Sequence, residues 1–327
     1  MNNVGFYDGT LKINGSIATD AQRTQITSVT FSKGLQKIGE FAFHGCYVLT
    51  SVGIPKSIKT IGDWAFSGCV LLTSVIFPEG LQSIGNGAFR NCPITSATFP
   101  EGLQSIGNGV FRNCPITSAT FPKSLQSIGN GAFSHCSLTS IIFTDSFSLK
   151  SILTILTIGY GAFQGCPLTS VIFPEGLQSI GDGAFQDCPL PSVIFPKSLQ
   201  IIGDLAFRDC PIKSVTFHQG LQSIGYNAFD GCPIVEAIFP EGVDSISDNV
   251  FDGNPVLQQL RLENQAASRR VAVLLSLKKL RYELYGDNYV AVQSAGTTAA
   301  TGTLEGKLAF QQITSDDVWR EILEKYV

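Results

Sequence analysis

A cysteine recurs about every 22 residues along most of this chain, and this spacing limits its possible folds more than any other feature. The intervals between successive cysteines are 23, 23, 22, 22, 30, 22, 22 and 22 residues. The nine cysteines are Cys46, Cys69, Cys92, Cys114, Cys136, Cys166, Cys188, Cys210 and Cys232. A fixed period of about 20 to 50 residues is typical of repeat proteins, in which each repeat forms one coil that packs on the next.

The repeated unit is the stretch FPEGLQSIGNGAFRNCPITSATF at residues 77–99, and residues 26–254 contain about ten copies of it. Ile94, Ala97 and Phe99 have the spacing of a strand that faces inward, and the Phe89 position predicts a buried aromatic column. The chain is 44% hydrophobic and only 15% charged, which suits many short strands joined by tight turns. Residues 80–101 and 102–123 differ at only two positions. The sequence therefore predicts a β-rich solenoid.

The pattern L-x-x-[VIA]-x-[FI]-P-x-x-L-x-x-I-G-x-x-A-F-x-x-C resembles the BspA-like family of leucine-rich repeats. Asn254 stands one repeat after Cys232, and a position that alternates between Asn and Cys is a mark of leucine-rich repeats. The resemblance implies a curved right-handed solenoid with a parallel sheet on its concave side and irregular or short 3₁₀ structure on its convex side. It also implies that the protein is an adhesin or a binding scaffold rather than an enzyme, as most members of the family are.

The remaining segments predict caps and an extension. We expect an N-terminal cap over residues 1–25, a solenoid over 26–254 with an insertion at 144–158, and a capping helix region over 255–293. Residues 294–327 then form a flexible linker and a short terminal amphipathic helix, which makes the C-terminal extension α-helical.

The cysteines are predicted to be buried and reduced, with thiols that help to satisfy turn backbone groups. Side chains from neighbouring parallel coils point the same way, which orients them poorly for disulfides, and there is no CxxC pair for a metal. His44, His135 and His218 are four or more repeats apart or on different sides, so we expect no catalytic group, metal site or cofactor.

The strand alternation predicts an outward column with several isoleucines on the concave face, where a protein partner could bind. The predicted contacts are Ile76, Ile142, Ile172, Ile194 and Ile238, with Phe147 in the insertion and Trp319 and Ile322 in the terminal helix as secondary contacts. Two alternatives stay open: a secreted or surface adhesin, and a solenoid whose outward Thr and Ser residues bind ice.

The charge pattern argues against nucleic acid as a partner, because the net charge is −4 and no run of Lys or Arg occurs in the repeats. No apolar run approaches the roughly 20 residues that span a bilayer. The N-terminus lacks the pattern of a secretory signal. We therefore expect the protein to be intracellular. The alternative is a surface location, which would hold if the natural protein has a leader that this sequence lacks.

Overall fold

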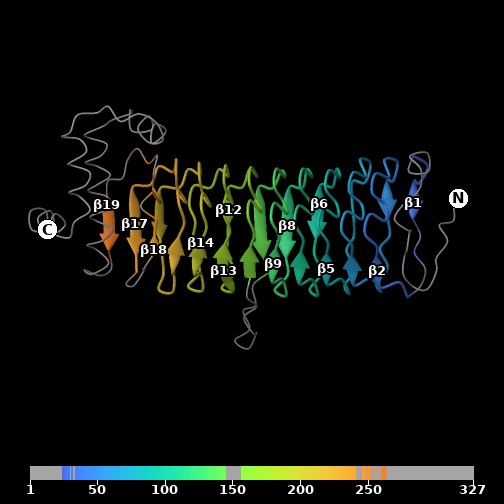
Figure 1. Ribbon diagram of the computed structural model, residues 1–327, viewed down its shortest axis with the longest axis horizontal. Coiled ribbons are helices and arrows are strands. Elements are labelled where there is room, and N and C mark those ends of the chain that lie inside the picture. The colour runs from blue at the N-terminus through green and yellow to red at the C-terminus, as the bar shows by residue number, and fades with distance from the viewer. Residues whose placement is uncertain are drawn as a thin grey trace, which may run out of the picture. The chain divides into compact units, whose positions relative to one another are not determined.

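The computed structural model describes residues 24–29, 31, 34–144, 156–240, 245–247, 249–251, 254 and 259–262, all in one compact unit that ends at Glu263. These residues form the predicted solenoid, whose coils follow one another from β1 to β19 (Figure 1). Every strand pair in it is parallel, and equivalent residues of neighbouring coils pair in register, as in Ser96 with Ser118 and Thr98 with Thr120. The described residues include strands and turns but no helix.

Each coil has two strand-bearing sides, which we call side A and side B, and a third side made of turns. Side A contains the strands at the position of the repeat that Ile94, Ala97 and Phe99 occupy, in three separate sheets of two, four and three strands. Its strands are β1 (Ser28–Val29), β3 (Ser51–Val52), β6 (Ser96–Thr98), β8 (Ser118–Phe121), β10 (Ser140–Phe143), β12 (Ser170–Val171), β15 (Ser214–Thr216), β17 (Glu236–Phe239) and β19 (Gln259–Leu262).

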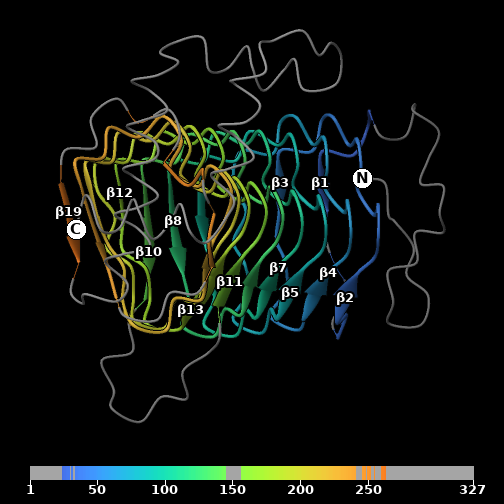
Figure 2. The same ribbon diagram turned by 60° about the vertical axis from the view of Figure 1, so that its left-hand side comes forward.

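Side B carries one continuous ten-stranded parallel sheet, and Figure 2 separates its strands from those of side A. Its strands are β2 (Lys37–Ile38), β4 (Thr60–Ile61), β5 (Ser83–Ile84), β7 (Ser105–Ile106), β9 (Ser127–Ile128), β11 (Leu156–Ile158), β13 (Leu177–Ile180), β14 (Ile201–Ile202), β16 (Ser223–Ile224) and β18 (Ser245–Ile246). We expected the main parallel sheet at the strand of Ile94, Ala97 and Phe99, which lies on side A. The longest sheet instead lies on side B. Leu103 and Ile106, both buried, anchor one such strand to the core.

A glycine follows nine of the ten side B strands and lets the coils approach closely. A Cβ on Gly107 would lie 2.8 Å from the backbone nitrogen of Asn86 and 2.9 Å from the carbonyl oxygen of Ile84, which no side chain tolerates without a shift. The φ of Gly107 is not in the left-handed region. The left-handed position comes two residues later, at Gly109, where φ is +59°.

The turn side is built from two alternating kinds of hydrogen bond. The N–H of Phe89 donates to the carbonyl of Val110 in the next coil at 3.0 Å, and the N–H of Arg90 donates to the carbonyl of Gly87 in its own coil at 3.1 Å. Because this alternation repeats along each coil, the irregular segment satisfies its backbone groups without a helix or a sheet.

Two columns of phenylalanine fill the core. The predicted column is confirmed: its ring centroids lie 5.1 to 5.9 Å apart, and its members from Phe43 to Phe229 are fully buried. A second column follows the side A strands, with contacts such as Phe99 to Phe121 at 5.5 Å. Rings of the two columns meet edge to face, as in Phe121 and Phe133. A single coil cannot bury such rings alone, so stacking provides the core.

Candidate binding surface

The outward positions of side A present isoleucines on three consecutive coils. Ile142, Ile172 and Ile194 expose 56%, 73% and 81% of their surface, whereas the neighbouring inward residues Ile141 and Val171 are buried. The paired strands β10 and β12 lie about 4.8 Å apart at Ile142 and Ile172, and Ile194 occupies the same position of the next coil, so the three side chains follow one another along side A. We call Ile142, Ile172 and Ile194 the isoleucine row.

The two other predicted isoleucines do not extend this row. Ile76 is 83% exposed, but Thr98 and Thr120 occupy the same column between it and Ile142. Ile238 also occupies an outward position, in β17, but it is half-buried and so less exposed than the isoleucine row.

Small hydroxyl side chains lie next to the isoleucine row. Ser170 and Ser192 are exposed and Ser140 is half-buried, each two positions before an isoleucine on the same face. The isoleucines therefore stand above their immediate neighbours, and another chain can approach them without a charged or bulky side chain in between.

The sheets of side A are interrupted at the coil of Ile194. Within the described residues, the backbone groups of Ser192 to Phe195 make no hydrogen bond to a neighbouring coil. In the coil before, the N–H of Thr169 donates to the carbonyl of Thr139 at 3.2 Å, but the equivalent residue of this coil is Pro191, which has no N–H. The centroids of Phe173 and Phe195 also lie 6.2 Å apart, compared with 5.5 Å for Phe99 and Phe121. The proline is the sequence signal of this interruption.

Three predicted contact residues lie outside the described residues: Phe147 of the insertion, and Trp319 and Ile322 of the terminal helix.

The cysteine column has the structural role that the sequence predicted. All nine cysteines are free and buried, and eight thiols donate to the carbonyl of a phenylalanine in the preceding coil, at distances from 3.0 to 3.2 Å. Burial raises the pKa of Cys166 and of Cys232 to about 12 and also raises that of Cys114. Neutral thiols of this kind are poor nucleophiles and poor metal ligands.

A ladder of Asn and Asp side chains lines the corner between side B and the turn side. Oδ1 of Asn108 accepts the N–H of Asn130 at 2.7 Å, and Oδ1 of Asp204 accepts the N–H of Tyr226 at the same distance. An open depression beside Asp182, Asp204 and Tyr226 continues this corner. Among the described residues, no group of three or more His, Cys, Asp or Glu side chains could hold a metal ion.

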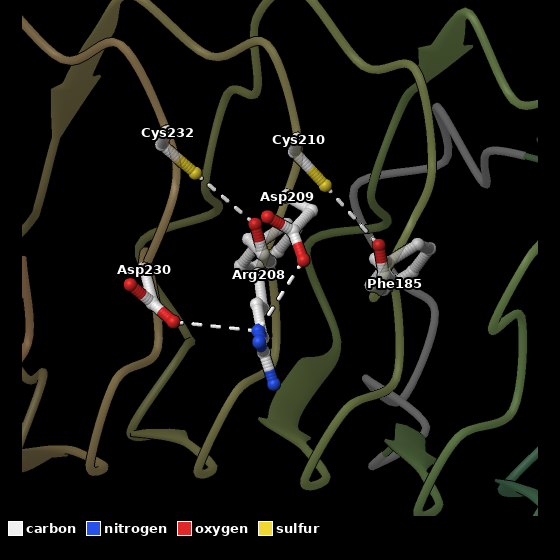
Figure 3. A network of polar contacts seen from close by, with 7 residues as sticks. Phe185, Arg208, Asp209, Cys210, Asp230 and Cys232 are labelled. Atoms are coloured by element: carbon white, nitrogen blue, oxygen red, sulfur yellow. Dashed lines mark hydrogen bonds and ion pairs between the residues drawn. The ribbon is translucent and has the colours of Figure 1, made fainter. Parts of the chain in front are cut away.

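Charge on the turn side is organised around arginines. Nε of Arg208 lies 3.3 Å from Oδ2 of Asp209 and 3.3 Å from Oδ2 of Asp230, so it joins two coils (Figure 3). Arg90 and Arg112 occupy the equivalent position of earlier coils.

The three histidines lie on separate coils. No helix in the described part of the chain has the length and hydrophobicity to cross a membrane.

The comparisons with known proteins agree on the type of repeat. A family model described as a BspA type leucine rich repeat region matches the chain in 6 copies, over residues 21–139, 82–154 and 156–269. None of the curated proteins matches the chain.

Several solved structures are similar to this chain. A leucine-rich repeat protein from Bacteroides ovatus is 25% identical, with 72% of this chain and 78% of that chain covered and a TM-score of 0.47. The leucine-rich repeat protein of T. pallidum is 31% identical, with 50% and 76% covered and a TM-score of 0.42. A third, from Eubacterium ventriosum, is 22% identical, with 69% and 74% covered and a TM-score of 0.44.

Proposed function

Because this chain belongs to the family of BspA-type leucine-rich repeat proteins, we propose that it is a non-enzymatic scaffold that binds a protein partner through side A. The isoleucine row supports the proposal. Three large aliphatic side chains on consecutive coils are more than half exposed, and their burial by a partner would remove apolar surface from water.

The surroundings of the row favour a protein as the partner. Its neighbours are serines rather than charged residues, so a contact there is apolar at its centre and uncharged at its edge. Such a centre with a polar surround is the usual arrangement of a protein interface. Phe147, Trp319 and Ile322 remain proposed secondary contacts.

The test is a comparison of two charged variants of the whole chain in the same column. Proteins captured by the Ile172→Lys/Ile194→Lys variant are compared by quantitative mass spectrometry with those captured by wild type and by Thr98→Lys/Thr120→Lys. Binding of the purified partner to all three chains is then measured. We expect the isoleucine variant to bind at least about 10-fold more weakly, because an apolar contact would now bury a charge.

The threonine variant is the matched control, since it adds the same charges to the same column two coils away. Both variants should keep the wild-type melting temperature, because the changed side chains are at outward positions. Equal partner binding by the two variants would exclude the isoleucine row as the contact.

We also propose that this binding takes place inside the cell. The nine cysteines support this placement, because protein thiols stay reduced in a reducing compartment. The competing placement is a surface adhesin. Protease treatment of intact cells distinguishes them: an intracellular protein keeps its full length, whereas a surface protein is cleaved.

A further inference from the structure

Three arginines share one column of the turn side, at the residue that follows the buried phenylalanine, and they differ in their partners. Arg208 is paired with Asp209 and Asp230 (Figure 3). Arg90 and Arg112, on two neighbouring coils, have no ion pair among the described residues. At this position of the repeat, the charge of Arg208 is thus neutralised by carboxylates, whereas the charges of Arg90 and Arg112 are not.

The groups around Arg90 and Arg112 do not supply the missing negative charge. Asp63 uses both carboxylate oxygens on Asn86, with bonds of 2.7 Å to its N–H and 3.1 Å to its Nδ2. Asn91 and Asn113, the next residues along each coil, are neutral and bond to each other at 3.0 Å. Arg90 and Arg112 occupy the same position of neighbouring coils, whose spacing is about 4.8 Å, so an anion that binds there would be attracted by both positive charges.

Arg90 is also held in place by an aromatic contact. Its Cζ lies 5.6 Å from the centroid of the Trp64 ring, and its Nε is buried without a hydrogen-bond partner. The other neighbour of Trp64 is Gly87, where a Cβ would lie 2.7 Å from the ring. The guanidinium is therefore positioned by packing rather than by a carboxylate, which leaves its charge available to a ligand.

The aromatic residues beside Arg90 occupy a backbone position that favours glycine. Phe41 and Trp64 have φ values of +54° and +57°, whereas the next five coils place a glycine there. A left-handed φ is unfavourable for a bulky residue, by roughly 1 to 2 kcal/mol. Their rings are parallel at 6.5 Å, and Phe41 is 51% exposed. Trp64 is kept at this cost beside Arg90, and Phe41 extends the aromatic surface next to Trp64.

We propose that Arg90 and Arg112 bind carboxylate groups of an acidic protein segment, and that Phe41 and Trp64 contact an apolar side chain of that segment. The planar guanidinium matches a carboxylate, and Trp, Phe and Arg side chains are enriched in interface hot spots; here Phe41 and Arg112 are exposed, and Trp64 and Arg90 are half-buried. Two cations are few for a polyanion, whose binding depends on many phosphate or sulfate contacts, so a protein segment fits better. This surface is separate from the isoleucine row and does not depend on it.

The test uses the whole chain with Trp319→Phe, in which Trp64 is the only remaining tryptophan. The probe is the peptide acetyl-Glu-Glu-Phe-Glu-Glu-amide, titrated at low ionic strength while Trp64 fluorescence and the binding heat are recorded. We expect binding that changes the fluorescence and weakens with salt. Arg112→Gln should weaken it about 10-fold or more, and Arg112→Lys, which keeps the charge but not the planar fork, should weaken it less.

The matched control is Lys197→Gln, which removes one exposed positive charge elsewhere and should change the affinity by less than about 2-fold. Ile172→Lys/Ile194→Lys should leave peptide binding unchanged, which separates this site from the proposed partner face. The proposal is overturned if no binding occurs at about 1 mM peptide, or if Arg112→Gln and Lys197→Gln behave alike. Tighter, Arg112-dependent binding of a heparin hexasaccharide than of the peptide would also overturn it, in favour of a sulfated polysaccharide.

Discussion

The thiol of Cys92 donates to the carbonyl oxygen of Phe66 in the preceding coil at 3.0 Å, and that carbonyl also accepts the N–H of Cys69 at 3.2 Å. Cys136 and Phe111 repeat the relationship at 3.0 Å. Each such carbonyl therefore joins a turn in its own coil to a side chain of the next. The cysteine column connects the coils through a buried acceptor that would otherwise have one partner fewer.

Replacing one of these cysteines should destabilise the solenoid. Cys136→Ala removes a thiol donor and leaves a small cavity in a buried site, so we expect the free energy of unfolding to fall by about 1 to 3 kcal/mol. Urea unfolding followed by circular dichroism measures the change. Ser170→Ala, at an exposed position of the next coil, should cost less than about 0.5 kcal/mol. An equal effect of the two substitutions would contradict a role for the column.

Stability should fall at alkaline pH because the buried thiols resist ionisation. The pKa of Cys166 is about 12 in the folded protein, against an ordinary value of 9.0. Below pH 9 the thiol is protonated in both states and contributes no pH dependence. Between pH 9 and 12 only the unfolded chain releases the proton, so the free energy of unfolding falls by up to about 1.4 kcal/mol per pH unit for this thiol.

Urea unfolding at several alkaline pH values measures this slope. Lysines and tyrosines also titrate in the range, so Cys166→Ala is the comparison that isolates the thiol. The variant should show a shallower decline than wild type, and parallel curves would rule out the contribution.

Two glycines two residues apart should respond differently to the same substitution. Gly107→Ala would place a Cβ 2.8 Å from the backbone of the previous coil, and we expect a loss of about 2 to 3 kcal/mol as the coils separate. Gly109→Ala meets no atom within 4 Å but keeps a φ of +59°, so it should cost about 1 kcal/mol. Urea unfolding of both variants ranks them, and the reverse order would show that backbone conformation matters more than coil contact.

The interruption at Pro191 should be visible in amide hydrogen exchange. The N–H groups of Ser192 to Ile194 lack inter-coil bonds, whereas Ser118–Phe121 is paired with a strand on each side. We expect the first segment to exchange faster when peptides are followed by mass spectrometry. Pro191→Thr restores the missing donor and should slow exchange at 192–194. Similar protection of the two segments in wild type would mean that side A is continuous.

Periodicity alone was sufficient to predict the stacked interior. The recurring Phe89 and Cys92 positions predicted a buried column of each, because a residue that repeats once per coil must stack on itself. The same alternation placed Ile172 and Ile194 on the surface, since neighbouring residues of a strand point to opposite faces. These predictions needed only the period and the polarity of each position.

Contacts that depend on a single departure from the repeat were not predicted. Pro191 lacks the N–H that Thr169 uses in the coil before, at one of the two places where side A is interrupted. β19 pairs with β17, one strand beyond the predicted end of the repeats at residue 254. The packing of Arg90 on Trp64 joins different positions of neighbouring coils, which a column-by-column reading of the sequence does not consider.

The in-register pairing allows whole repeats to be gained or lost. Equivalent residues pair between neighbouring coils, and residues 80–101 and 102–123 are nearly identical. If one such unit were added or removed, the contacts between neighbouring coils would therefore remain the same. Trp64 and the isoleucine row lie on opposite sides of these two units along the chain. Each added unit would move them apart by about 4.8 Å. The number of units therefore sets the distance between Trp64 and the isoleucine row, in steps of one coil.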